Sequence, residues 1–361
     1  MHKANLCNLI ILFSCLLVGC SLQPVDWVSV KGKNLKGRSG IPLLDPNDPN
    51  GPFVVKKKVE NEDFNNIIMK ANIKLNDTCR IKYLWPDYLI SGKMVVEGKL
   101  GSNGRKYPVV LDTGCPVTCI VTDKHVIRNR LPIYHLGNNP TYSADMGLCK
   151  IPELRIGKMT MVDLPCLYIE KRDAIQIFGV TIAYDESMLI GLQIIQAFKY
   201  VMFDNISKEV EFSPRKIFEP AHPQLWKSYP FVIKKKSNDN DAIFVTMAVA
   251  GQDVQLYLDT GSGGGLRLNE QIWEKLRGKI PINKLKNGNF RTAFLGNIAC
   301  KKGTVKELDI GGRTIKNVEI VVFPDDNPTN LQTLLGMKYF RDTIIVLDFQ
   351  RKLLWVKDKW N

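Results

Sequence analysis

An Asp-Thr-Gly turn occurs twice in the chain, each time directly after an apolar run that is typical of a β-strand. Val109 to Leu111 precede Asp112, and Leu256 to Leu258 precede Asp259. One such tripeptide alone is weak evidence, because Asp and Gly are common turn residues at strand ends. Two copies behind matching strands favour a fold in which one β-rich unit is used twice.

The sequence around each turn repeats the same order of elements. A pair of strands leads into each Asp, and a helix start follows ten residues later, at Thr122 and at Asn269. A Glu-Leu-X-Ile-Gly strand-turn unit comes next, and an apolar-apolar-Gly segment then ends at Gly191 or Gly336, at nearly the same separation from its own Asp. Landmarks that recur in this order predict one internal duplication.

The length of 361 residues allows two modest domains outside a targeting segment. We predict a signal peptide over 1–19 and a lipidated N-terminus with a linker over 20–60. A first lobe over 61–215, a proline-containing connection over 216–240 and a second lobe over 241–361 follow.

The N-terminus has the features of a secretion signal. Lys3 supplies a positive charge, Leu9 to Val18 form a short apolar core, and the segment ends Leu-Val-Gly-Cys at Cys20. This ending resembles the lipobox of bacterial lipoproteins, which implies lipidation of Cys20. We therefore expect a protein of the bacterial cell envelope, outside the cytoplasm and held to a membrane by lipid. An ordinary secretory signal or an uncleaved anchor is the alternative.

Composition excludes several other classes of function. The formal net charge is +14, but Lys and Arg are spread along the chain without an aromatic-interleaved block, so no nucleic-acid partner is expected. The four His fall in no metal or triad spacing, and no phosphate-binding glycine loop is found, so we expect neither metal nor cofactor. Six cysteines lie beyond Cys20, and buried free thiols are their default interpretation.

From about Met94 to Asp358 the chain resembles the pepsin-like and retropepsin-like aspartic proteases. The resemblance implies a mostly β, bilobal fold with short helices, in which related barrel-like lobes meet at a cleft, and a peptide or protein substrate. It makes Asp112 and Asp259 the catalytic pair. By the same resemblance the supporting residues are the two threonines that cross-brace the turns, the turn glycines, the residues after them, and the glycines packed beneath: Thr113, Thr260, Gly114, Gly261, Cys115, Ser262, Gly191 and Gly336.

The chemistry gives a separate reason to bring two carboxyls together. Hydrolysis of an amide without a metal or a nucleophilic side chain needs a base for water and a proton donor for the carbonyl. Two carboxyls about 3 Å apart cannot both ionise easily, so they share a proton; aspartic proteases are the stock example of this effect. One Asp from each repeat supplies such a pair.

Three further features bear on activity and on its alternative. Cys115 stands where the family usually has Ser, Thr or Ala, and because a thiol is a weak donor we expect an optimum less acidic than pH 2–3. Tyr142 lies in the interval of the family's flap, although an ordinary tyrosine is the stronger interpretation. A catalytically silent pepsin-like lipoprotein that binds peptides is the alternative to a lipid-anchored endopeptidase. In either case we expect a monomer.

Overall fold

The computed structural model describes residues 53–55, 67–69, 71–84, 92–101, 104–115, 117–131, 133–139, 144–169, 174–177, 180–184, 187–235, 241–282, 284–292, 296–325 and 333–359. In these ranges the protein is mostly β with short helical segments, which confirms the predicted fold class. No helix in the described ranges is long and apolar enough to cross a membrane. The predicted signal peptide, Cys20 and Tyr142 lie outside them.

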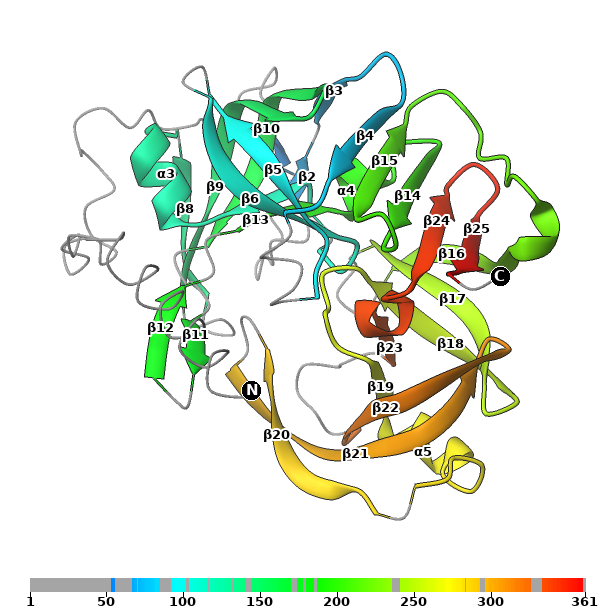
Figure 1. Ribbon diagram of the computed structural model, residues 1–361. Helices are drawn as coiled ribbons and strands as arrows, with labels where there is room; N and C mark the ends of the chain where they lie inside the picture. The colour runs from blue at the N-terminus through cyan, green and yellow to red at the C-terminus, as the bar shows by residue number, and fades with distance from the viewer. Residues whose placement is uncertain are drawn as a thin grey trace, which may run out of the picture. The chain divides into compact units, whose positions relative to one another are not determined.

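The first repeat closes into a six-stranded barrel, drawn in cyan and green in Figure 1. The ring runs β10-β7-β13-β6-β5-β9, and the pairing of β9 with β10 closes it. Its strands are β5 (Val95–Leu100), β6 (Arg105–Asp112), β7 (Cys119–Val121), β9 (Ala144–Ile156), β10 (Met159–Ile169) and β13 (Met188–Gly191). Two further strands extend it at β10 and β9, namely β3 (Asn72–Lys74) and β8 (Ile133–Asn139).

The second repeat builds the same barrel in the same order, β22-β19-β23-β18-β17-β21. The pairing of β21 with β22 returns the ring to its first strand, and β21 joins β17 through Val249 and Ile310. The internal duplication in the sequence is therefore a duplication of this barrel. The strands are β17 (Asp241–Val249), β18 (Gln252–Asp259), β19 (Leu266–Asn269), β21 (Gly296–Ile310), β22 (Arg313–Phe323) and β23 (Leu334–Gly336). Strand β20 (Lys286–Thr292) extends it at β21.

One antiparallel sheet takes strands from both halves of the sequence. Its order is β16-β25-β24-β14-β15-β4, and β14 pairs with β24 across the two halves. The strands are β4 (Cys79–Lys82), β14 (Tyr200–Asp204), β15 (Glu209–Ser213), β16 (Lys227–Lys235), β24 (Thr343–Asp348) and β25 (Leu353–Asp358). Strand β16 lies inside the predicted connection 216–240 and pairs with both β25 and β17, so part of that connection is a sheet strand.

The remaining elements are short. Two separate hairpins pair β1 (Phe53–Val55) with β2 (Ile67–Met69), and β11 (Ala174–Ile177) with β12 (Val180–Tyr184). The helical segments are α3 (Asp123–Asn129), α4 (Leu192–Ile195), η3 (Pro223–Leu225), α5 (Glu270–Leu276) and η4 (Met337–Phe340). Helices α3 and α5 begin next to the predicted starts at Thr122 and Asn269. Asn269 caps α5, since its side chain accepts a hydrogen bond from Ile272 N at 2.9 Å.

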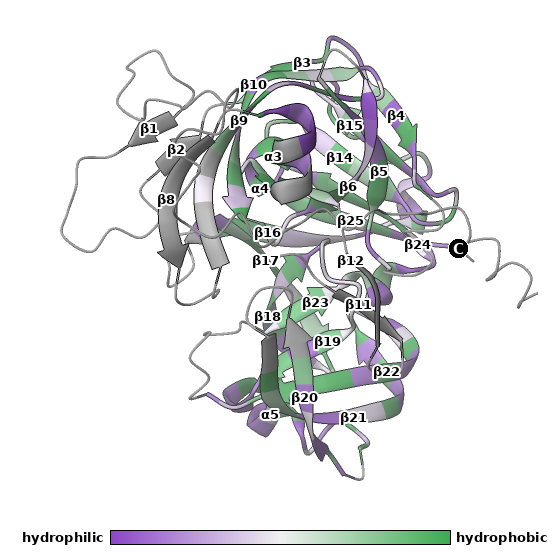
Figure 2. Ribbon diagram, turned by 90° about the vertical axis from the view of Figure 1, so that its left-hand side faces the viewer, coloured by the Kyte–Doolittle hydropathy of each residue, from purple (hydrophilic) through white to green (hydrophobic). Residues whose placement is uncertain are grey.

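The apolar runs that lead into the two aspartates are core strands. Val109, Leu111, Leu256 and Leu258 are each at most 1% exposed. Burial of one such side chain contributes about 1.5–3 kcal/mol relative to leaving it in water. Figure 2 shows hydrophobic bands along the strands of both barrels. Each aspartate therefore stands at the end of a strand that is fixed by the interior of its own barrel.

The cysteines beyond Cys20 are buried free thiols in this structure, in agreement with their default interpretation: Cys79, Cys115, Cys119, Cys149, Cys166 and Cys300.

Candidate active site

The two Asp-Thr-Gly turns have the same backbone geometry. Asp112 is the last residue of β6, and Asp259 is the last residue of β18. Each strand then turns tightly, with Cys115 N donating to Asp112 O and Ser262 N donating to Asp259 O, both at 3.2 Å. The turns are thus built alike in the two repeats, as the sequence predicts.

The threonines of the two turns hold the turns to each other. Thr113 N donates to Thr260 Oγ1 at 2.9 Å, and Thr260 N donates to Thr113 Oγ1 at 3.0 Å. Each hydroxyl then donates to the strand of the opposite barrel: Thr113 Oγ1 to Leu258 O at 2.9 Å, and Thr260 Oγ1 to Leu111 O at 2.7 Å. Both threonines are fully buried. Four mutual hydrogen bonds therefore fix the position of one aspartate-bearing turn against the other.

Replacing Thr113 by Ala is expected to destabilise the protein by about 2–4 kcal/mol, because it leaves Thr260 N and Leu258 O buried without these partners. Thr113→Ser keeps the hydroxyl and should recover most of that loss. Chemical denaturation of the two variants gives the comparison. Equal stability of Thr113→Ala and Thr113→Ser would show that these bonds contribute little.

The two carboxyl groups meet between the turns. A Cβ placed on Gly114 would lie 2.6 Å from Asp259 Oδ1 and 2.9 Å from Asp112 Oδ1, so both oxygens flank the same point. A Cβ placed on Gly261 would overlap the Asp112 carboxyl. Each turn glycine therefore leaves the space that the opposite aspartate fills. The structure brings the two predicted catalytic residues into one site.

A glycine stands beneath each aspartate. Strand β13 lies parallel to β6 with Gly191 opposite Asp112, and β23 lies parallel to β18 with Gly336 opposite Asp259. The residue after each glycine donates to the turn: Leu192 N to Cys115 O and Met337 N to Ser262 O, each at 2.8 Å. Side chains are excluded here, because a Cβ on either glycine would run into backbone atoms of the turn. The predicted supporting glycines thus pack directly against the aspartate turns.

The electrostatics of the site favour a shared proton. Burial, followed by the negative charge of Asp259, raises the pKa of Asp112 to about 7. The hydrogen bond between the carboxyls acts in the same direction, whereas the Gly114 N–H and the charge of Lys93 act against it. Because the groups interact strongly, this value describes the pair rather than one side chain. Near neutral pH the pair therefore holds one proton.

The partners of the two carboxylates differ. Asp112 Oδ1 accepts from Gly114 N at 2.7 Å and Cys115 N at 3.2 Å, whereas Asp259 Oδ1 is buried without a hydrogen-bond partner. Both aspartates keep part of their surface exposed, so solvent reaches the pair. The backbone of the site is symmetric, but its hydrogen bonding is not.

The residues after the two glycines differ as well. Burial raises the pKa of the Cys115 thiol well above its usual value, which keeps it neutral beside Asp112. Ser262 Oγ accepts a hydrogen bond from Arg267 Nη2 at 2.7 Å. Arg267 is not among the residues predicted from the sequence. The available signal was a cation in an otherwise apolar Leu-Arg-Leu strand, where the first repeat has Cys-Ile-Val.

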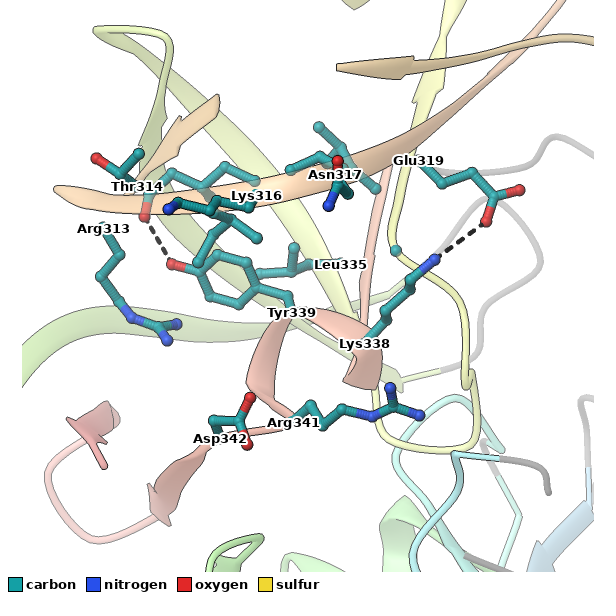
Figure 3. A pocket seen from close by; sticks show the side chains of 15 residues that line it. Arg313, Thr314, Lys316, Asn317, Glu319, Leu335, Lys338, Tyr339, Arg341 and Asp342 are labelled. Atoms are coloured by element: carbon teal, nitrogen blue, oxygen red, sulfur yellow. Dashed lines mark hydrogen bonds and ion pairs between the residues drawn. The ribbon is translucent and has the colours of Figure 1, made fainter. Parts of the chain in front are cut away.

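A cavity of about 330 Å³ lies in the second repeat but is lined by neither aspartate (Figure 3). Arg313 pairs with Asp358 at 2.5 Å and its guanidinium stands over the Tyr339 ring at 4.7 Å. Lys338 and Glu319 form an ion pair at 3.5 Å across the other end. Arg313, Lys338 and Glu319 at this cavity are thus held in ion pairs.

Among the described residues, no group of three or more His, Cys, Asp or Glu is placed to hold a metal ion. The candidate site contains carboxyls, hydroxyls, backbone groups, the Cys115 thiol and the Arg267 guanidinium. The flap candidate Tyr142 lies outside the described residues, so its role stays a prediction.

Part of the chain is similar to a known protein family. Residues 245–339 match the family model described as aspartyl protease, a range that contains Asp259 and Gly336. The search of curated proteins found no match. Among solved structures, the chain resembles conglutin gamma, a basic 7S globulin from lupine seeds. The identity is 11% and the TM-score 0.44, over 80% of this chain and 95% of that one.

Proposed function

We propose that this protein is an aspartic endopeptidase that hydrolyses peptide bonds with a water molecule activated by Asp112 and Asp259. The observation that carries the proposal is the meeting of the two carboxyls within one cross-braced pair of turns. The family match covers the second turn, and the duplicated geometry extends the same interpretation to the first. Both aspartates and both threonines are present, as a hydrolase of this kind requires.

The arrangement supports general acid–base hydrolysis. The ionised carboxyl takes a proton from water as the water oxygen bonds to the substrate carbonyl carbon. The protonated carboxyl donates to the carbonyl oxygen, which produces a tetrahedral diol. Transfer of a proton to the amide nitrogen then allows the C–N bond to break, and an acid and an amine leave. Positioned acid–base groups of this kind contribute about 10²–10⁴-fold each.

The test is digestion of a mixed peptide library, with mass spectrometry of the products and with pepstatin as inhibitor. Pepstatin-sensitive cleavage at internal bonds is the expected result. Peptides that are retained on the protein but uncut would favour the alternative, a silent peptide-binding lipoprotein. Cleavage that a metal chelator abolishes and pepstatin leaves unchanged would contradict the proposal.

The pH dependence of cleavage is expected to show a loss of rate above about pH 7. The pair needs one proton, and the raised pKa of Asp112 to about 7 sets where this proton leaves. Initial rates between pH 3 and pH 9, in buffers of constant ionic strength, measure this loss of rate at high pH. A rate that still rises from pH 7 to pH 9 would contradict a shared-proton mechanism.

We also propose that the protein is anchored outside the cytoplasm through a lipid on Cys20, as the resemblance of residues 17–20 to a lipobox suggests. The mass of the mature N-terminal peptide distinguishes a diacylated Cys20 from an unmodified one. A mature protein that still begins at Met1 would exclude this anchor.

A further inference from the structure

The charge at the site breaks the symmetry of the duplication. Arg267 and Ile120 occupy equivalent positions, since each stands eight residues after its aspartate and pairs with the first residue of the apolar-apolar-Gly segment, at Leu334 and Leu189 respectively. Ile120 is a core residue of β7. A cation at this position therefore belongs to the second repeat only.

The side chain of Arg267 is held in one place from two sides. Its guanidinium carbon stands 4.2 Å from the centre of the Phe290 ring, and Nη2 donates to Ser262 Oγ at 2.7 Å. Its Nε is buried without a hydrogen-bond partner. Gly264 lies next to it, and a Cβ there would be in ordinary contact with Nη2, at 3.5 Å. A stacked and hydrogen-bonded guanidinium is less mobile than a lysine ammonium would be.

The hydrogen bond to Ser262 links the positively charged guanidinium of Arg267 to the Asp259 turn. Arginine is only a donor, so the bond uses a lone pair of Ser262 Oγ and leaves the hydroxyl proton free to point elsewhere. Ser262 belongs to the same turn as Asp259, whose Oδ1 has no hydrogen-bond partner. The positive charge of Arg267 thus acts on Asp259 through a residue of its own turn, whereas the cation that acts on Asp112 is Lys93.

We propose that Arg267 is a positioning residue that makes Asp259 the ionised member of the pair and leaves the shared proton on Asp112. The inference rests on the proposed function, because it assigns the base to Asp259 and the acid to Asp112. Asp112 Oδ2 can carry the proton, since the two backbone N–H groups bond to Oδ1.

Among the other groups that act on the pair, Lys93 opposes this asymmetry. Its charge, two residues before β5, lowers the pKa of Asp112, but burial and the charge of Asp259 outweigh it, and the Cys115 thiol beside Asp112 is neutral. Burial raises the pKa of Tyr257 well above its usual value, so this phenol is neutral too. On Arg267, burial lowers the pKa, and the charges of Asp259 and Glu319 oppose that effect. Arg267 adds a direct hydrogen bond from its guanidinium to Ser262 in the Asp259 turn.

The experiment compares Arg267→Gln with Arg267→Lys. Gln keeps a donor for Ser262 but has no charge, so the pH–rate profile should move upward by about one unit or more, because the ionised pair has lost its cation. Lys restores the charge and should return the profile most of the way. Arg313→Gln is the matched control, since it removes a buried arginine that stands over an aromatic ring in the same barrel, away from the aspartates. Its profile should coincide with that of the parent.

A profile of Arg267→Gln that coincides with the parent's would overturn the inference. So would equal shifts for Gln and Lys, because the charge would then not be the cause. If Arg313→Gln does not fold, Arg277→Gln at the exposed end of α5 replaces it as the control.

Titration of ¹³C-labelled aspartate carboxyls by NMR tests the same point without catalysis. In the parent, the Asp112 signal should keep its proton to higher pH than the Asp259 signal, and Arg267→Gln should reduce that difference. If the parent cleaves no peptide but the titration behaves in this way, the proposed function fails and the inference about Arg267 stands. If cleavage occurs and the titration order is reversed, the inference fails alone.

Discussion

Replacing either Asp112 or Asp259 by Asn is expected to lower peptide cleavage by at least about 10³-fold. An amide can neither take the proton from water nor supply one to the carbonyl oxygen, and the two groups act as a unit, so loss of one removes most of the benefit of both. The double variant should consequently be little worse than either single variant. Initial rates on one cleaved peptide, measured for all three variants, provide the comparison.

The control is Asp204, which lies outside the catalytic pair and, like Asp348 in the second repeat, is the last residue of its strand. Asp204 ends β14, where its Oδ1 accepts from Ile206 N and Ser207 N in a turn. Asp204→Asn keeps an acceptor oxygen for that turn, and cleavage should stay within about twofold of the parent. A loss of rate as large as that of Asp112→Asn would show that the assay reports stability rather than chemistry.

Asp112→Asn should also change how stability depends on pH. The folded-state pKa of about 7 exceeds the ordinary value of 3.8, so the folded protein binds the extra proton between these pH values. The parent therefore loses stability as pH rises through about 7, at roughly 1.4 kcal/mol for each unit of pKa shift. Asparagine does not titrate, so the variant should be more stable than the parent at pH 8 and nearly equal to it at pH 3.5. Thermal unfolding at both pH values shows whether this sign is right.

The site could be predicted from the sequence as far as its determinants are local. Asp112 and Asp259 each follow an apolar run, and Gly191 and Gly336 each end one. The aspartate turns and the glycines packed beneath them can therefore be recognised from short sequence patterns. The duplication then shows which segments correspond. The resemblance to a known family added the expectation that the two turns lie against each other. In the structure, four hydrogen bonds made by Thr113 and Thr260 hold them together.

Other features depend on partners that are distant in the sequence. Strand β16 contains Pro230 and three lysines and gives a weak strand pattern, yet β25 and β17 pair with it on its two sides. Closure of the second barrel depends on a single pairing of Val249 with Ile310. The position of Arg267 is meaningful only because Phe290, 23 residues later, supplies a ring for it. No local sequence pattern predicts any of these contacts.

The second large effect is expected at the glycines beneath the aspartates. Gly336 has φ −96° and ψ 176°, an extended conformation that any residue adopts, so space rather than backbone preference excludes a side chain. A Cβ there would overlap Gly264 O and lie 2.9 Å from Ser262 O, and both are backbone atoms that cannot rotate away. A Cβ on Gly191 would likewise overlap Val117 O and Cys115 O. Either substitution must displace the turn that carries an aspartate.

We therefore expect Gly336→Ala to destabilise the protein by about 3 kcal/mol or more and to lower cleavage at least about tenfold, since a shift of the Asp259 turn misplaces one carboxyl of the pair. Gly278→Ala is the matched control: a Cβ at Gly278 meets nothing within 4 Å, and its stability should stay within about 0.5 kcal/mol of the parent. Denaturant unfolding of both variants, followed by rates on the folded fraction, separates the two effects. Full activity in a folded Gly336→Ala protein would mean that the turn does not need this support to hold Asp259 in place.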